Sequence, residues 1–488
     1  MSYLELLKLA APETIVVVTA LIVLTIGLTT ARASRIGPIV AAIGIVMAIG
    51  AILRLPQHEN LFGGMLVVSP LNSLFKIVCL VLAFATIPLA TSEKSLRNPG
   101  EYLALLLFGA LGLMLLVGSE ELLMIFIGLE LLGLSLYVLA AFDKTDVRSA
   151  EAGLKYFLFG STASAFTLFG ISLVYGMSGT TALAAIGQKL AAGPVQPLLA
   201  IGIIMTLVGF AFKITAAPFH LWAPDAYQGA PIPSAAFIAS GSKVASFVVL
   251  GKIVLTGFAS ARGSADWHAM IAGWSPVLAA LAALSIQLGN FVALAQTNVR
   301  RLLAYSAVAH GGYTLLGIIA GDRNGFSATL FYTTVYAVTL VGAFAVVGVV
   351  RRDTGGDDLQ NFAGFAKRSP FLAACMSIFL LSLAGLPPLA GFFGKFYLFS
   401  AAFRAGANHG LLWLVGLALF GSFVSLYYYL IPLKMMFVDR ASASDSGHSL
   451  PATRHLVANA TIAVLAGAVL FFGLMPQTLA ARILATLP

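Results

Sequence analysis

The chain has 488 residues, of which 59% are hydrophobic and 10% are charged, and its formal net charge is +9. A soluble domain carries about 25% charged residues, so this composition excludes a soluble enzyme or binding domain. The basic residues are spread over connections without forming a patch, which excludes nucleic-acid binding. The two cysteines, Cys79 and Cys375, are too few for an iron–sulfur or zinc site, and nothing indicates a disulfide.

Apolar runs long enough to cross a membrane recur from Pro12 to Pro476. They predict an all-α polytopic membrane protein with about fourteen transmembrane helices. A signal peptide is not expected, because the positive charges of Arg32 and Arg35 follow the first apolar run rather than precede it. The predicted spans are 12–30, 36–53, 69–90, 101–118, 120–142, 152–176, 196–229, 234–256, 274–297, 301–320, 326–350, 369–401, 410–436 and 455–476.

Two of these spans, the seventh and the twelfth, are too long for a single crossing. As a continuous helix, 196–229 would measure about 51 Å against a hydrocarbon core of about 30 Å. It contains Pro218 and Pro224, and 369–401 contains the Leu386-Pro387-Pro388 run. Proline removes a backbone donor and interrupts a helix. Both spans are therefore predicted to be broken helices.

The broken spans are five helices apart, and an odd number of helices returns with opposite topology. This spacing predicts two inverted five-helix repeats, helices 4–8 in 101–260 and helices 9–13 in 271–436. Three helices in 1–100 precede the repeats, and one helix in 455–488 follows them. Paired broken helices in corresponding positions of two halves are typical of transport sites.

Orientation is predicted from the basic residues of the connections. With the N-terminus outside, the inner connections carry fourteen Lys and Arg residues, from Arg32 to Arg454, and the outer segments carry seven. The imbalance favours both termini outside, most simply in a bacterial inner membrane.

Four charged residues lie within otherwise apolar spans: Glu130, Lys213, Lys243 and Lys395. A charge costs roughly 3 kcal/mol or more at that depth unless it faces a partner or a wet cavity. Glu130 is interpreted as a proton carrier or as the counter-ion of Lys213, the alternative being a structural acid. The lysines are candidates for a proton relay, and snorkelling to the surface is the alternative for each.

Three further residues are secondary candidates. Lys155 lies near the inner end of its span and can equally snorkel. His220 follows the first helix break and His310 lies inside the tenth span. Histidine titrates near physiological pH and suits a proton relay, but a membrane histidine also serves as a hydrogen-bonding strut.

Lys76, Lys252 and Lys434 lie nearer the ends of their spans and are expected to be interfacial anchors. The three consecutive tyrosines at 427–429 are expected to be packing or interface residues, although one hydroxyl could extend a water chain.

Four motifs resemble a known family, the antiporter-like membrane subunits of respiratory complex I (NADH:quinone oxidoreductase). The run FKITAAPFHLWAPDAYQGAP at 212–231 is similar to the seventh-helix signature, and LPPLAGFFGKF at 386–396 is similar to the twelfth-helix motif. AYSAVAH at 304–310 and EAGLKY at 151–156 are similar to the motifs of the tenth and sixth helices. The YQGAP ending resembles the N branch of the family, and the lysine at 395 favours the N or L branch over the M branch. The resemblance covers roughly residues 100 to 435.

The resemblance implies fourteen helices with inverted repeats, and it places Glu130, Lys213, Lys243 and Lys395 on the family's proton path, with Lys155, His220 and His310 secondary. It implies proton translocation coupled to quinone reduction elsewhere in the complex. No cofactor or metal is expected in this chain; NAD, flavin, iron–sulfur clusters and quinone are expected in partner subunits. The other expected partners are membrane subunits of the complex, lipid and protons.

Two alternatives remain open at this point. The first is a subunit of a multi-subunit cation/proton antiporter, which has the same architecture. The second is a structural membrane anchor for a redox assembly, although an anchor has no use for four buried charges.

Overall fold

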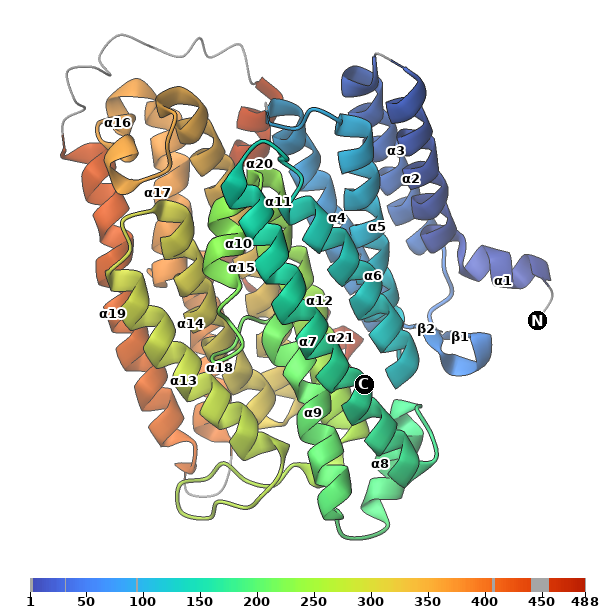
Figure 1. The fold of residues 1–488 in the computed structure, drawn as a ribbon. Coiled ribbons are helices and arrows are strands. Elements are labelled where there is room, and N and C mark those ends of the chain that lie inside the picture. Colours follow the sequence, from blue (N-terminus) through green and yellow to red (C-terminus); the bar gives the residue numbers. More distant parts are fainter. Residues whose placement is uncertain (1–2, 31, 94, 406–408, 440–455, 488) are drawn as a thin grey trace.

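The computed structural model describes residues 3–30, 32–93, 95–405, 409–439 and 456–487, and it consists largely of helices (Figure 1). Lys94, Arg440 and Arg454, three of the basic residues on which the predicted orientation depends, lie outside these ranges. Within the described ranges, twelve helical segments are long and apolar enough to cross a membrane. The prediction of a polytopic α-helical membrane protein is therefore confirmed.

The N-terminal part contains three of these spans and a small hairpin. Its elements are α1 (Tyr3–Leu9), α2 (Ala11–Thr29), α3 (Ala33–Ile52), β1 (Glu59–Leu61), β2 (Leu66–Val68) and α4 (Pro70–Ser92). The two strands pair antiparallel, with Glu59 opposite Val68. The hairpin was not predicted, because strands of three residues are too short to show an alternating pattern.

The next part of the chain contains three long helices and five shorter ones. The elements are α5 (Pro99–Gly118), α6 (Leu122–Ala140), α7 (Val147–Ser178), α8 (Leu183–Ala191), α9 (Pro197–Lys213), α10 (Ala223–Gly229), α11 (Ile232–Ala239) and α12 (Gly241–Lys252). Helix α7 begins before the apolar run, because the Asp146 side chain accepts a hydrogen bond from the backbone N–H of Arg148 and caps the helix.

The C-terminal part of the chain repeats this alternation of long and short helices. It contains α13 (Trp274–Leu294), α14 (Val299–Ala320), α15 (Arg323–Thr354), α16 (Phe365–Arg368), α17 (Pro370–Ala384), α18 (Ala390–Arg404), α19 (Leu412–Phe437), α20 (Leu456–Leu474) and α21 (Gln477–Thr486). Helices α8 and α21 were not predicted, because each is too short to give the apolar run of a membrane span.

The centre of the bundle is formed by α14, α15 and the segment Ile232–Gly257, which contains α11 and α12. In each of them 94% of the most apolar stretch is buried inside the protein, against 28% in α2 and 33% in α20. The outer helices therefore present their apolar side chains outward, as a lipid-facing surface requires. Small residues allow close helix contact: a Cβ added at Gly100 would lie 2.4 Å from the Cα of Gly27.

Two proline-containing segments interrupt the helices. Helix α9 ends at Lys213 and α10 begins at Ala223, while α17 ends at Ala384 and α18 begins at Ala390. Gly385, directly after α17, has a φ of +85°, which glycine adopts readily. The first interruption lies beside Lys213, and the second lies within two helical turns of Lys395.

A further interruption at Ser240 was not predicted. The backbone there has φ −111° and ψ −81°, and it separates α11 from α12 inside the expected span 234–256. The Ser240 hydroxyl donates to the carbonyl of Ala236 at 2.7 Å, and serine hydroxyls compete in this way for helical carbonyls. Lys243 therefore lies in the first turn of a new helix, close to the centre of the bundle.

Candidate functional site

The site begins at Lys213, the last residue of α9. Its side chain is buried, and its Nζ has no hydrogen-bond partner among the described residues. Aromatic rings surround it instead: Nζ lies 5.5 Å from the ring centre of Tyr137, 5.8 Å from that of Tyr156 and 5.5 Å from that of Phe212. Ring faces attract a cation without offering it a hydrogen-bond acceptor.

Glu130 lies on α6, near Lys213. It is half-buried, and the Ser164 hydroxyl of α7 donates to its Oε1 at 2.5 Å. Glu130 and Lys213 both line a cavity of about 10 Å³. A cavity of that size holds about one water molecule. The two side chains do not form a direct ion pair within 4.0 Å.

Lys243 is bound by neutral oxygens. Its Nζ donates to Thr215 Oγ1 at 2.8 Å and to the carbonyl of Ala307 at 2.9 Å, and it lies 5.5 Å from the ring centre of Tyr336. Thr215 is fully buried in the non-helical segment after α9, with a φ of +60°. The interruption of α9 therefore supplies Lys243 with a ligand only two residues after Lys213.

His310, on α14, is bonded through both ring nitrogens. Its Nδ1 is hydrogen-bonded to the hydroxyl of Tyr332, and its Nε2 to the hydroxyl of Tyr429 at 2.9 Å. Tyr429 in turn donates to Ser306 Oγ at 2.6 Å. All four side chains are buried, and they come from α14, α15 and α19. The imidazole therefore lies at the junction of three helices.

Lys395, on α18, is also bound by neutral oxygens. Its Nζ donates to the carbonyl of Ala384 at 3.1 Å and to Ser422 Oγ at 2.9 Å. It lies 5.2 Å from the ring centre of Tyr313. The carbonyl of Ala384 is at the end of α17, where the interruption of the helix leaves carbonyls without helical partners.

Aromatic side chains join Lys243 to Lys395 through His310. The ring centre of His310 lies 4.9 Å from that of Tyr336 and 5.6 Å from that of Tyr313. Those two tyrosines are the ones that lie over Lys243 and Lys395. The structure thus brings Lys213, Lys243, His310 and Lys395 into one buried row, with Glu130 beside its first member.

Two of the predicted residues lie apart from this row. Lys155 forms ion pairs of 2.6 Å with Glu151 and with Asp225, and its side chain is 39% exposed. Asp225 also binds Arg301 at 2.6 Å, so it joins α7, α10 and α14. His220 is buried, and its ring centre lies 6.3 Å from that of Tyr305. Neither residue touches a lysine of the row.

Sequence reasoning missed several members of the site. Tyr332 and Tyr336 are four residues apart and therefore share one face of α15, a spacing visible in the sequence. Thr215 and Asp225 lie within the run at 212–231 but were assigned no role. Tyr429 was expected to be a packing or interface residue, with the alternative that one hydroxyl of 427–429 extends a water chain; in the structure its hydroxyl bonds to His310.

The anchor interpretation is wrong for two lysines. Lys76 is buried and forms an ion pair of 2.6 Å with Glu13, and Lys252 is buried against α4 and α5. Their partners come from helices distant in the sequence, so a position near a span end did not reveal them. Lys434 is exposed, as an anchor should be.

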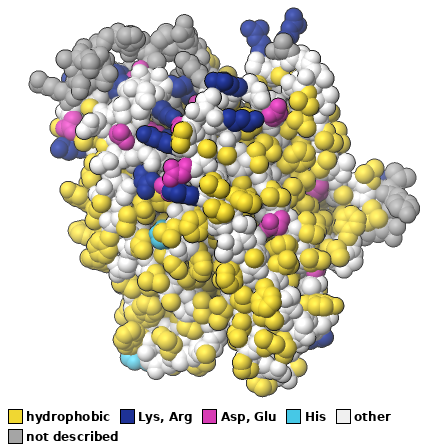
Figure 2. Space-filling model, in the orientation of Figure 1, with side chains coloured by type: hydrophobic (Ala, Val, Ile, Leu, Met, Phe, Trp, Pro, Cys, Tyr) yellow, Lys and Arg dark blue, Asp and Glu magenta, His cyan; other side chains and the backbone are white. Residues whose placement is uncertain are grey.

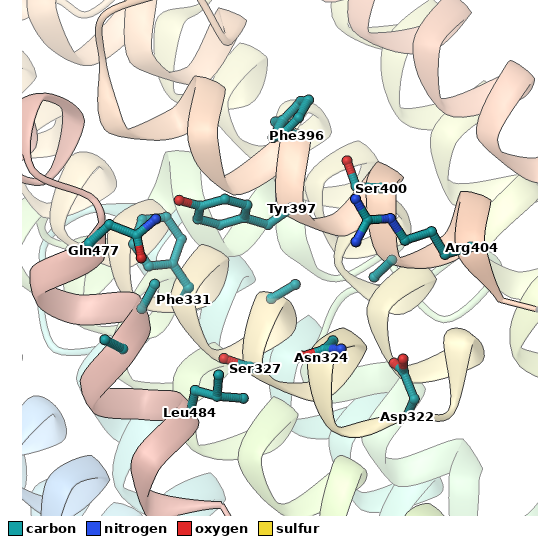
Figure 3. Close-up of a pocket in the computed structure, with 14 residues that line it drawn as sticks. Asp322, Asn324, Ser327, Phe331, Phe396, Tyr397, Ser400, Arg404, Gln477 and Leu484 are labelled. Carbon is teal, nitrogen blue, oxygen red and sulfur yellow. The ribbon is translucent and has the colours of Figure 1, made fainter.

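A cavity of about 410 Å³ lies between α15, α18 and α21 (Figure 3). Phe396, Tyr397 and Arg404 of α18 line one wall, and Phe331 of α15 lines another. None of the seven predicted site residues, all of which the structure describes, lines this cavity. Lys395 extends instead toward Ala384 and Ser422, so this cavity is separate from the lysine row.

Comparisons with known proteins identify the family of the chain. Residues 119–424 match the family model described as NADH:quinone oxidoreductase/Mrp antiporter, transmembrane, and this stretch contains Glu130 and the three lysines of the row. The chain is 45% identical over 495 residues to a relative from Acidobacterium capsulatum named NADH-quinone oxidoreductase subunit N 2, with 98% of both chains covered.

Solved structures show the same fold. A chain in the structure of respiratory complex I from Thermus thermophilus with bound aureothin is 31% identical, with a TM-score of 0.78 over 96% of this chain and 98% of that one. A chain of the Mrp complex from Dietzia is 19% identical and shares the fold, with a TM-score of 0.84 over 98% of this chain and 97% of that one. The chain belongs to the NADH:quinone oxidoreductase/Mrp antiporter transmembrane family.

Proposed function

We propose that this chain is a proton-translocating membrane subunit, of the N type, of an NADH:quinone oxidoreductase. The observation that carries the proposal is the buried row of lysines. Lys243 and Lys395 are held by carbonyl and hydroxyl oxygens, and no carboxylate of the described residues is bonded to either. An ammonium without a counter-ion in a membrane interior is costly, and such residues mark proton or ion pathways.

In this proposal the proton passes along Glu130, Lys213, Lys243 and Lys395, with His310 between the last two. The Glu130–Lys213 pair acts as the electrostatic switch. An ion pair at 4 Å is worth about 4 kcal/mol at an effective dielectric constant of 20. Moving one charge across 100 mV costs about 2.3 kcal/mol. The free-energy change on closing or opening one such pair is therefore large enough to drive a proton against the membrane potential.

Lys155 and His220 belong to the proposal as secondary residues. Lys155 lies in the half-exposed network with Asp225 and Arg301, and this network can take protons from water at the inner surface. His220 lies in the non-helical segment between α9 and α10, with an unbonded Nδ1. We infer that it assists transfer toward Lys213 through water.

The architecture is proposed to consist of fourteen spans with two inverted repeats. The twelve long spans and the two interrupted segments, α9–α10 and α17–α18, together make fourteen. The two longest helices, α7 and α15, have 32 residues each. Each is the last membrane span before an interrupted segment, with one short α-helix separating the two. This parallel supports the division of the chain into two repeats, residues 101–260 and 271–436. The helices of residues 1–100 precede the repeats, and the helix of residues 455–488 follows them.

Both termini are proposed to face the outside of a bacterial inner membrane. Figure 2 supports this orientation, because Lys and Arg side chains gather at one end of the visible face and are sparse at the other. Basic residues accumulate on the inner side of membrane proteins. The curated relative comes from a bacterium.

The redox chemistry is assigned to other subunits. We infer that NAD, flavin, iron–sulfur clusters and quinone bind there, while this chain contacts membrane subunits, lipid and protons. The described residues place no three His, Cys, Asp or Glu side chains together as a metal site. The two cysteines are single and buried.

A cation/proton antiporter subunit is the second candidate, favoured by the fold similarity to the Mrp complex. A tagged form of the chain, purified from its native membrane, separates the two. Copurification with flavin and iron–sulfur subunits, and NADH-driven proton uptake that disappears when this chain is deleted, support the proposed function. Sodium-dependent proton exchange without NADH oxidation would support the antiporter instead.

A further inference from the structure

The cavity of about 410 Å³ between α15, α18 and α21 changes from polar to apolar along one direction. Phe396, Ser400 and Arg404 of α18 line it at intervals of four residues, so they share one face of the helix (Figure 3). Helix α18 ends at Arg404, which lies at the outer surface in the proposed topology. Phe396 lies about 12 Å deeper in the membrane, because eight residues of helix separate it from Arg404.

Helix α15 shows the same change of polarity, starting from its first turn. The helix begins at Arg323, also at the outer surface, and the residues with which it lines the cavity run from Asn324 through Ser327 to Phe331. The ring centre of Phe331 lies 5.3 Å from that of Tyr397 on α18. Two helices of opposite direction therefore place polar side chains at the outer end of the cavity and aromatic rings at its deeper end.

Alanines keep the space between these helices open. Ala328, Ala401, Ala480 and Ala481 line the cavity, and a methyl group fills little of it. The volume lies within the range of about 300–1,000 Å³ that is typical of small-molecule sites. Phe396 is 54% exposed, so the wall that it forms is open to the hydrocarbon of the membrane. A molecule in the cavity can therefore extend into the bilayer.

The polar end of the cavity carries one charge of each sign. Asp322 and Arg404 are the charged residues among the 14 that line it, all of which the structure describes. Arg404 is exposed and has no hydrogen bond or ion pair with any described residue. Asp322 accepts a hydrogen bond from the N–H of Gly325 through Oδ1 at 2.7 Å, and its Oδ2 has no partner in the described ranges. No ion pair within 4.0 Å joins Asp322 to Arg404. Both charges are therefore available to a ligand.

We propose that this cavity binds a zwitterionic phospholipid with a primary ammonium headgroup, the chemistry of phosphatidylethanolamine. The guanidinium of Arg404 binds the phosphate, because its paired N–H donors match two phosphate oxygens. The carboxylate of Asp322 binds the ammonium. The ester groups lie at the level of Ser400, and the acyl chains pass Phe396 into the hydrocarbon. A phospholipid without the ammonium would leave Asp322 facing a phosphate, and like charges disfavour such a ligand.

The first test measures binding of the phosphate. The assembled complex in detergent is titrated with phosphatidylethanolamine that carries a photoactivatable diazirine on one acyl chain, and labelled peptides are identified by mass spectrometry. Peptides containing Phe331 or Phe396 should be labelled to saturation. Arg404→Gln should raise the half-saturating concentration about tenfold, the lower range for a hydrogen bond to a charged group. Arg482→Gln is the matched control, because Arg482 is exposed on α21 and does not line the cavity. Equal labelling of these peptides in Arg404→Gln and wild type overturns the inference.

The second test concerns the ammonium. The titration is repeated with phosphatidylglycerol, which has the same phosphate and acyl chains but no ammonium. The wild-type complex should bind phosphatidylethanolamine more tightly than phosphatidylglycerol. Asp322→Asn removes the carboxylate charge and keeps the cap of α15, since asparagine caps helices as well as aspartate does. This variant should lose most of the preference by weakening the phosphatidylethanolamine site alone. Equal binding of the two lipids by the wild type, or an unchanged preference in Asp322→Asn, overturns the assignment of the headgroup.

The third test asks whether a neighbouring protein fills the cavity instead. The photoreactive amino acid p-benzoylphenylalanine is placed at Ser400 and irradiated in native membranes before extraction. A mass increase of one phospholipid on this chain supports the inference, whereas a cross-link to another subunit overturns it. None of these measurements uses proton transport as its readout. Absence of lipid binding, together with impaired transport in Lys213→Ala, would therefore remove the lipid site and leave the proposed function intact.

Discussion

The junction at His310 gives the sharpest prediction. Tyr429→Phe removes a buried hydroxyl that is bonded to His310 Nε2 at 2.9 Å and that donates to Ser306 Oγ at 2.6 Å. The neighbouring Tyr428→Phe is a matched control. Its hydroxyl is also buried and donates to Asn290 at 3.1 Å; it interacts with the Tyr429 hydroxyl, and no hydrogen bond joins it to the histidine in the part of the chain that the structure describes.

The size of the effect follows from the lost hydrogen bond. Leaving a buried polar group without its partner costs about 1–3 kcal/mol. If the activation free energy of the proton-transfer step rises by the same amount, the step slows by about 5- to 150-fold, because about 1.36 kcal/mol corresponds to a factor of ten in rate. We therefore expect NADH-driven proton transport by the Tyr429→Phe complex to fall at least about fivefold, with Tyr428→Phe much closer to wild type.

The assay is NADH-driven quenching of a pH-sensitive dye in inverted vesicles, with assembly checked by native gel electrophoresis. The two tyrosines lie side by side, with ring centres 4.6 Å apart, so a packing defect should affect both variants similarly. Equal losses in the two variants, or wild-type transport in an assembled Tyr429→Phe complex, would refute the role of the His310 junction.

Further predictions concern the first part of the row and the orientation. Lys213→Ala should lower proton transport and coupled quinone reduction while the complex still assembles, and Lys434→Ala, at an exposed lysine, should leave both unchanged; intact transport in an assembled Lys213→Ala complex contradicts the relay. Glu130→Gln should act like Lys213→Ala because the amide does not titrate, with Glu130→Asp milder, and wild-type behaviour of both would make Glu130 structural. A cysteine at His268 should react with an impermeant thiol reagent on right-side-out vesicles and one at Ser95 should not; the reverse pattern would invert the proposed topology.

The signals in the sequence were strongest where charge and helix interruption coincide. Lys213 precedes Pro218 and Lys395 follows Pro388, so both could be identified in apolar runs without any knowledge of packing. The interruption at Ser240 had no such marker, because a serine inside an apolar run rarely ends a helix. It became visible only in the backbone geometry.

Contacts between distant helices were the part that the sequence did not reveal. Glu13 is 63 residues from Lys76, and Asn72 is 180 residues from Lys252. Position within a span predicts depth, but not whether a side chain faces lipid or another helix. The same ambiguity hid Tyr332, whose role depends on the packing of α15 against α14.

The aromatic enclosure of Lys213 has a consequence for how readily that residue exchanges a proton. Three ring faces replace part of the hydration shell of the ammonium, and none of them fixes the direction of an N–H bond. Losing a proton at Lys213 therefore breaks no hydrogen bond to the surrounding protein, and little reorganisation accompanies the change of charge. A leucine in place of Tyr137 should raise that reorganisation cost, whereas a phenylalanine should preserve the enclosure.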